Sequence, residues 1–350
     1  MSSIPTLQGI TSTMVQTSRI NQHVLMTAGE GAAIIFIHGN CSSATFWEET
    51  MLRLPDSYVG IAPDQRGYGE TEPLTIDATQ GLDDMAADIL ALAETLGHAQ
   101  FHLVGHSMGG NVVMKIALMA PAKILSMTLV ATGSPYGYSG SKGADGEIVF
   151  EDGAPAGGGS GNPDFVRLIA ENERGEADQM APRNVMRAFY YKPPFVPERE
   201  EDLLSSLLST KTGDAHYPGN FTPSENWPGV APGTTGILNA LARKYYDASS
   251  ITEIDPKPPV LWIRGADDMI VADNAMFDVA ALGAMGAIPG HPGVDVCPPQ
   301  PMIAQTRAVL EIYAAKGGDY TEVVMADTGH TPYIEKPAEF DQHFHALLGA

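Results

Sequence analysis

The segment Gly105–Gly110, which reads GHSMGG, has the residue types and spacing that most directly indicate chemistry. It lies between an apolar run and a helical pattern, the setting in which a G-x-S-x-G turn presents a nucleophilic serine. So tight a turn needs small residues two positions before and after the serine, and Gly105 and Gly109 meet that need. The three letters alone would occur by chance in about one chain in ten of this length, so the setting makes the pattern specific. We predict that Ser107 is a nucleophile.

A serine hydroxyl is a useful nucleophile only when a base accepts its proton and an acid orients that base. With this type of serine turn, the acid precedes the base in the chain. Of the ten histidines, His330 follows a late apolar run in a tight turn, and we predict that it is the base. The preceding apolar run, 260–263, is followed by Asp267 and Asp268, which compete for the role of acid. The run 127–131 is followed by Thr-Gly-Ser and offers no acid.

The oxyanion that forms during acyl transfer needs two backbone N–H donors, one of them from the residue after the nucleophile. Met108 supplies that donor. The early apolar run 32–37 ends in a loop where Gly39 lets the backbone approach a ligand and Asn40 presents its N–H, so we predict Asn40 as the second donor. No basic residue lies near Cys41 in the sequence to activate its thiol, and we expect a small packed residue there.

Short apolar runs bounded by Gly, Pro or Asp alternate with segments of helical periodicity, which predicts a doubly wound parallel sheet. The carboxyl ends of parallel strands share one edge, where the serine, acid and histidine turns would meet. The expected strands are 32–37, 58–62, 101–104, 127–131, 260–263 and 322–325, and the clearest helices are 84–96 and 111–119.

The alternation stops after Thr132 and resumes near Pro259, which predicts a mostly helical cap domain inserted into an α/β core. Its helical candidates are 164–173, 182–189, 198–208 and 236–246. The expected division is core 1–133, cap 134–250 and core 251–350.

The cap contains aromatic residues that could line a pocket for an apolar group, and also a glycine-rich run. We expect the run 157–161 to be a flexible connection, and the proline-rich stretch 285–300 to be a surface loop. The candidate substrate-binding residues are Phe189, Tyr190, Tyr191, Phe195 and Trp227, although each could equally belong to a small core of the cap itself.

The composition excludes several partners. The 42 acidic against 20 basic residues give a formal net charge of −22, so nucleic acid and anionic membrane surfaces would be repelled. No stretch approaches the roughly 18 apolar residues of a membrane span, and residues 1–20 do not read as a signal peptide. The two cysteines, Cys41 and Cys297, do not form a disulfide framework. We expect a cytoplasmic enzyme that needs no metal or other cofactor.

These motifs together resemble the α/β-hydrolase superfamily, and the resemblance extends over the whole predicted core. It rests on His38-Gly39, Asp64–Gly69 (DQRGYG), Gly105–Gly110, Gly265–Asp268 and the stretch from Gly329-His330 to Pro337. The HGNCSS loop that begins at His38 is similar to that of bacterial esterases and acyl-homoserine-lactone hydrolases of this superfamily.

The resemblance implies roles for further residues. The pattern of the related enzymes favours Asp268 as the acid, which leaves Asp267 as a solvated turn residue. Apart from the resemblance, we expect Arg66 with Asp64 to brace the core beneath the site, and Glu335 before Pro337 to be a start signal for the last helix.

The expected activity is hydrolysis of a carboxylic ester or lactone, on a neutral or apolar small molecule, through an acyl-enzyme on Ser107. Related enzymes that open epoxides or remove halides carry an aspartate where this chain has Ser107, which argues against those reactions. Two alternatives remain open. One is hydrolysis of an amide or a carbon-carbon bond by the same residues, and the other is a hydrolase-like binding protein with negligible turnover. The sequence leaves the oligomeric state open.

Overall fold

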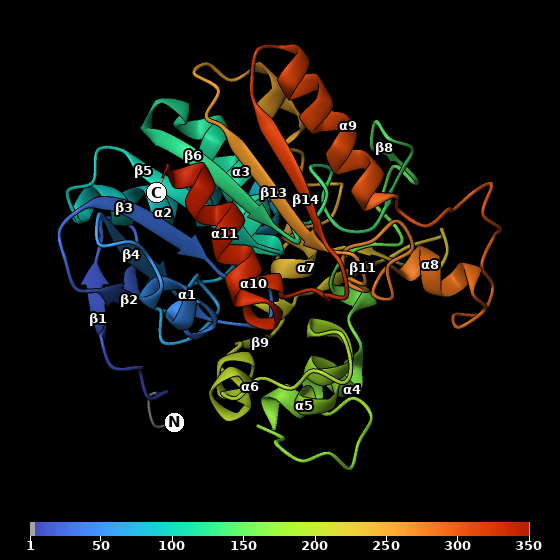
Figure 1. The fold of residues 1–350 in the computed structure, drawn as a ribbon. Helices are drawn as coiled ribbons and strands as arrows, with labels where there is room; N and C mark the ends of the chain where they lie inside the picture. The colour runs from blue at the N-terminus through green and yellow to red at the C-terminus, as the bar shows by residue number, and fades with distance from the viewer. Residues whose placement is uncertain (1–3, 350) are drawn as a thin grey trace.

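An eight-stranded sheet forms the centre of the computed structural model, which describes residues 4–349 (Figure 1). The strand order is β1-β2-β4-β3-β5-β6-β13-β14. The first three strands in that order pair antiparallel, and every other pair is parallel. The bounds are β1 Ile10–Gln16, β2 Asn21–Thr27, β3 Ala32–Ile37, β4 Tyr58–Pro63, β5 Phe101–His106, β6 Ile124–Val130, β13 Val260–Gly265 and β14 Tyr320–Met325.

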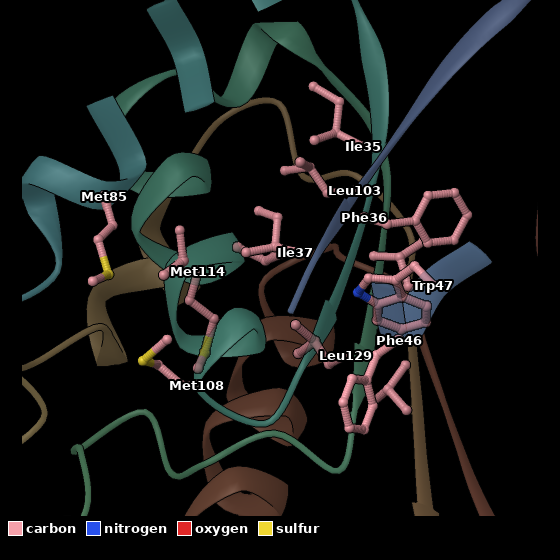
Figure 2. Packing of buried hydrophobic residues seen from close by; sticks show 14 of the residues in the cluster. Ile35, Phe36, Ile37, Phe46, Trp47, Met85, Leu103, Met108, Met114 and Leu129 are labelled. Carbon is pink, nitrogen blue, oxygen red and sulfur yellow. The ribbon is translucent and has the colours of Figure 1, made fainter. Parts of the chain in front are cut away.

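All six strands expected from the apolar runs are present, and the doubly wound α/β architecture is confirmed. The β1–β2 hairpin was not expected, because β1 is largely exposed and the buried part of β2 includes Gln22 and His23, so neither strand has a long apolar run. Side chains of β3 alternate between two buried layers. Figure 2 shows Phe36 on the side of Trp47 and Ile37 on the side of Met114. Helices cover both faces, and the main ones are α2 (Asp83–Thr95), α3 (Met108–Met119), α9 (Met302–Ala315) and α11 (Pro337–Leu348).

Residues 131–259 form an insertion between β6 and β13, which lie side by side in the sheet with Met127 opposite Val260. Figure 1 shows α4, α5 and α6 grouped below the sheet. The insertion contains α4 (Pro163–Ala170), α5 (Pro182–Val185), α6 (Glu200–Leu208), α7 (Ile237–Ala240) and three two-stranded pairs, β7 (Ser141–Lys142) with β8 (Glu147–Ile148), β9 (Thr212–Gly213) with β10 (Tyr217–Pro218), and β11 (Phe221–Pro223) with β12 (Val230–Pro232).

The helix expected over 236–246 is only four residues long. Its continuation would need the Leu241 carbonyl to accept from the N–H four residues later. That carbonyl instead accepts from the N–H of Tyr138, at 2.8 Å. A tertiary hydrogen bond to the start of the insertion therefore ends the helix.

The expectation that the glycine run 157–161 is a flexible connection is wrong. A Cβ on Gly157 would lie 2.5 Å from Asn239 Oδ1, and one on Gly158 would lie 2.4 Å from the carbonyl oxygen of Asn220. The N–H of Gly158 also donates to Asn239 Oδ1 at 2.7 Å. The glycines therefore allow backbone and side chains to pack closely within the insertion.

The remaining short helices are α1 (Glu48–Leu52), α8 (Val279–Ala284) and α10 (Pro332–Glu335). After α8 the chain has no helix or strand until α9, as the prolines of 285–300 predict. None of the helices within residues 4–349 has the length and apolar character needed to cross a membrane.

Packing of the glycine run gives a first prediction. Gly158→Ala should destabilise the protein by about 1–3 kcal/mol, the usual cost of forcing a group into a filled space. Gly175→Ala is the control, because a Cβ there meets only the flexible end of the Glu173 side chain, and we expect a change within about 0.5 kcal/mol. Thermal unfolding of both variants provides the comparison. Equal midpoints would support the flexible connection after all.

Candidate active site

Ser107 lies at the turn from β5 into α3, with φ 53° and ψ −123°. A positive φ is unfavourable for a residue with a Cβ and persists only when the surroundings impose it. Here the Ser107 N–H donates to the carbonyl of Val130 at 2.8 Å, and the Ser107 carbonyl accepts from Gly110 N at 2.9 Å. Strand β6 and the first turn of α3 therefore hold the serine in its strained position.

The glycines of this turn are required by direct backbone contact. A Cβ on Gly105 would lie 2.4 Å from the carbonyl oxygen of Gly109, and a Cβ on Gly109 would lie 2.2 Å from that of Ile37. The sequence pattern therefore has a structural cause, since the turn closes on itself and on the end of the neighbouring strand β3.

His330 and Asp268 meet above the ends of β13 and β14. His330 Nδ1 lies 2.8 Å from Asp268 Oδ2, and each side chain is 3% exposed. The other carboxylate oxygen of Asp268 accepts from the N–H groups of Ile270 and Val271, at 2.8 and 3.0 Å. Asp268 is thus fixed by its own turn and accepts the Nδ1 proton of the imidazole, which leaves Nε2 free to act as a base.

The adjacent carboxylate, Asp267, points elsewhere and forms an ion pair with Lys192 at 3.0 Å. The two turns approach so closely because β13 ends in glycine. A Cβ on Gly265 would lie 2.0 Å from the carbonyl oxygen of Gly329.

His106 is hydrogen-bonded to the backbone of His330. Its Nε2 lies 2.8 Å from the His330 carbonyl oxygen, and its Nδ1 lies 3.3 Å from the Tyr333 hydroxyl. Burial, reinforced by the neighbouring His330 and His38, holds the pKa of His106 well below its usual value. His106 is therefore neutral and donates a proton from Nε2 to the His330 carbonyl. The sequence did not reveal this role, because the position follows the glycine of the serine motif and carries no constraint of its own.

The loop after β3 lies directly against the serine, since a Cβ on Gly39 would be 3.0 Å from Ser107 Cβ. Within residues 4–349, no hydrogen bond uses the N–H of Asn40 or of Met108. Ser107 Oγ likewise makes no hydrogen bond in this part of the chain. Hydrogen bonds between catalytic groups often form only once substrate is bound.

The Asn40 side chain shapes this loop. Its Oδ1 accepts from the Tyr68 hydroxyl at 2.7 Å and from the N–H of Cys41 at 3.0 Å. These bonds accompany a left-handed φ of 48° at Cys41. Tyr68 belongs to the DQRGYG motif, but only the fold brings its hydroxyl to Asn40, so the sequence did not assign it.

Of the five aromatic candidates in the insertion, Tyr190 reaches the site. Its hydroxyl donates to the carbonyl of Cys41 at 3.0 Å, and its ring centroid lies 6.4 Å from that of His330. The others make different contacts. Phe189 packs against Phe277, Tyr191 and Phe195 pack against each other, and Trp227 packs against His291 and donates to the carbonyl of Pro289.

The structure bears on two expectations about supporting residues. Arg66 and Asp64 are both buried, and the carboxylate that pairs with Arg66 is that of Asp88, at 2.7 Å. The last helix, α11, begins at Pro337, and Glu335 itself ends the preceding α10.

Asp64 takes part in a second Ser-His-Asp arrangement. Ser12 Oγ lies 2.8 Å from His23 Nε2, and His23 Nδ1 lies 2.7 Å from Asp64 Oδ2. Burial opposes protonation of His23, but the hydrogen bond and charge of Asp64 outweigh it and raise the pKa of His23. A histidine that holds its proton is a poor base, and Asp64 also accepts from the N–H of Ala44 at 2.8 Å. We interpret this group as a structural link between β1, β2 and the loop after β3.

No cluster of three His, Cys, Asp or Glu side chains within 4–349 is placed to hold a metal ion.

Comparisons with known proteins agree with this architecture. Residues 32–145 match the family described as alpha/beta hydrolase fold. The curated relatives include a protein of Variovorax paradoxus, named provisionally as a carbamate hydrolase, with 36% identity over 102 residues, 29% of this chain and 38% of that one. N-formylmaleamate deformylase of Pseudomonas putida is 34% identical over 116 residues, 33% of this chain and 43% of that one. The chain thus spans less than half the length of these relatives.

Among solved structures, a thermophilic esterase of Thermogutta terrifontis matches 97% of this chain and 98% of its own. The TM-score is 0.58 at 18% identity, a likeness of fold.

Burial of the thiols gives a second prediction. Burial raises the pKa of Cys41 to about 12 and that of Cys297 to about 11. At pH 8 only about one Cys41 in 10,000 would be a thiolate. Iodoacetamide should therefore label neither residue in the native protein, whereas the protein unfolded in guanidinium should be labelled at both. Mass spectrometry gives the extent, and rapid native labelling of Cys41 would instead identify a reactive thiol beside Ser107.

Proposed function

We propose that this protein belongs to the α/β-hydrolase superfamily and is a serine hydrolase that cleaves a carboxylic ester or lactone. The observation that carries the proposal is the 2.8 Å hydrogen bond between Asp268 and His330. It forms at the sheet edge where the strained turn also presents Ser107. This arrangement supports His330 as the base and Asp268 as the orienting acid for Ser107.

In the proposed reaction, Ser107 Oγ attacks the substrate carbonyl carbon while His330 Nε2 accepts the hydroxyl proton. Asp268 stabilises the resulting imidazolium through Nδ1. The N–H groups of Asn40 and Met108 stabilise the negative oxygen of the tetrahedral intermediate. That intermediate collapses to the acyl-enzyme, and His330 transfers its proton to the departing alkoxide. Water then attacks the acyl-enzyme by the same steps and releases the carboxylic acid.

The proposed substrate is a neutral or apolar small molecule. The net charge of −22 disfavours approach of anions. Within the insertion, the guanidinium groups of Arg183 and Arg187 both form ion pairs with Glu200, and the Arg183–Glu200 distance is 2.6 Å. We further propose that the division into core 1–133, cap 134–250 and core 251–350 separates catalysis from substrate selection, with Tyr190 the cap residue placed to meet the substrate.

Amide hydrolysis is the second candidate. Matched relatives are named for carbamate hydrolysis and for removal of an N-formyl group, both of which involve a carbonyl bonded to nitrogen. The same residues would serve, with His330 protonating the departing nitrogen. A panel of esters, lactones, carbamates and anilides assayed with the purified protein would rank these bond types directly. No turnover of any acyl substrate would contradict the proposal and favour a binding protein.

The third prediction concerns the nucleophile. Ser107→Ala should lower kcat on a p-nitrophenyl ester by at least about 1,000-fold, because the acyl-enzyme can no longer form. The fold should persist, since alanine fits a turn that accepts only small neighbours. Circular dichroism controls for folding. Retention of more than about a tenth of the activity would exclude Ser107, given the losses usual for such residues.

The fourth prediction separates the two neighbouring carboxylates. Asp268→Asn should lower kcat by about 10,000-fold, because an amide in place of Oδ2 donates to Nδ1 and imposes the wrong tautomer. Asp267→Asn is the matched control, the same change at the adjacent, exposed position, and should change kcat by less than about threefold. The opposite ranking would assign the acid to Asp267.

A further inference from the structure

Glu335 is a half-buried carboxylate that the proposed reaction does not use. Its oxygens accept from the N–H of Gly329 at 3.0 Å and from the N–H of Lys192 at 2.8 Å, with a longer contact of 3.4 Å to the N–H of Thr331. Gly329 and Thr331 flank His330, whereas Lys192 belongs to the insertion. One carboxylate therefore joins the turn of the base to the insertion.

The segment 190–192 of the insertion touches both catalytic turns. The Thr331 hydroxyl donates to the Tyr190 carbonyl at 2.8 Å. Lys192 Nζ forms ion pairs with Asp267, at 3.0 Å, and with Asp327. These two aspartates lie in the turns that carry the acid and the base.

The contact between segment 190–192 and the His330 turn leaves no room for a side chain at Gly329. A Cβ on Gly329 would lie 2.7 Å from the nitrogen of Lys192 and 3.2 Å from Glu335 Oε1. Movement of 190–192 away from the core would therefore remove a hydrogen bond from Glu335 and uncover the residue that precedes His330.

Glu335 also supplies charge. Every hydrogen bond that the structure describes for its carboxylate comes from an N–H, and a protonated carboxyl would find no acceptor among these groups. Burial raises the pKa of Glu335, while the N–H donors and the nearby His330 act in the opposite direction. The backbone of the turn and of the insertion thus holds the carboxylate against the turn that carries His330.

We propose that Glu335 is a positioning residue that couples docking of segment 190–192 to the orientation of His330. This inference rests on the proposed function, in which His330 is the base. Other ionisable groups also face this region, from the acid turn, the His330 turn, the serine turn and the insertion. They are Asp268, His106, Asp267, Asp327, Lys192 and Tyr191.

Glu335→Gln tests the proposal, because it keeps the shape, removes the charge and turns an NH2 group toward one of the N–H donors. On a small p-nitrophenyl ester, kcat should fall about 10- to 100-fold, the effect expected of a misplaced base, with KM changed less than about threefold. The acid limb of the pH–rate profile should move to lower pH, since an imidazolium without the nearby carboxylate loses its proton more readily.

Glu48→Gln is the matched control. Glu48 is a fully buried glutamate that also accepts from a backbone N–H, that of Leu7 at 2.9 Å, and contacts the insertion through Arg199 at 3.1 Å. None of these described contacts joins it to the His330 turn, so its loss should lower stability and leave the pH–rate profile in place. Wild-type kcat and pH profile in Glu335→Gln, or equal changes in both variants, would overturn the proposal.

A second pair of variants tests the link to the insertion without touching Glu335. Lys192→Pro removes the N–H that donates to Glu335, whereas Lys192→Met removes only the ammonium group. Lys192→Pro should lower kcat as Glu335→Gln does, and Lys192→Met should not. Equal effects of the two changes would contradict the role assigned to the N–H.

NMR titration of the His330 imidazole in the wild type and in Glu335→Gln needs no substrate. It therefore separates failure of this inference from failure of the proposed function. A midpoint at lower pH in the variant supports the coupling even if no ester is hydrolysed, and an unchanged midpoint overturns it even in an active enzyme.

Discussion

Direct contact between backbones at the carboxyl edge of the sheet is the constraint on which the other features depend. The serine turn packs against the end of β3, the loop after β3 packs against Ser107, and the His330 turn packs against the end of β13. The contacts at Gly109 and Gly265 are closer than a Cβ would permit, and a Cβ on Gly39 would crowd that of Ser107 at 3.0 Å. Close-packed backbone has few alternative arrangements, so the Ser107 turn, the His330 turn and the loop after β3 are held at fixed separations before any substrate arrives.

Buried carboxylates that accept backbone N–H groups provide the second organising device. Asp64 accepts from the chain after the oxyanion loop, Asp268 from its own turn, and Glu335 from the His330 turn and the insertion. Each carboxylate satisfies N–H groups that a turn would otherwise leave unpaired, and each contacts or lies near a histidine. Part of the chain's negative charge thus lies inside the core, where it orders turns and, at Asp64, raises the pKa of His23.

The insertion is integrated with this edge. Tyr190 bonds to the oxyanion loop, and the neighbouring backbone bonds to the His330 turn. The glycine run 157–161 packs closely within the insertion and is not a flexible connection. A change in how the insertion docks would therefore alter the loop after β3 and the His330 turn together.

The sequence by itself determined six of the eight sheet strands, the serine turn and the histidine turn, because buried parallel strands and tight glycine turns leave local signatures in residue type and spacing. It also predicted Asp268 over Asp267, although only by resemblance, since two adjacent carboxylates share the same local setting. The direction in which each points was decided by tertiary contacts, the hydrogen bond to His330 for one and the ion pair with Lys192 for the other.

The ion-pair partner of Arg66 and the hydrogen bonds of Glu335 were decided in the same way, and neighbours in the chain identify neither. A glycine in the sequence is equally ambiguous, because glycine occurs both in flexible linkers and where backbone and side chains pack most closely. Only the surrounding atoms distinguish the two. Local sequence therefore fixes which groups are available, and the fold fixes which of them meet, because long-range contacts between turns depend on every strand and helix between them.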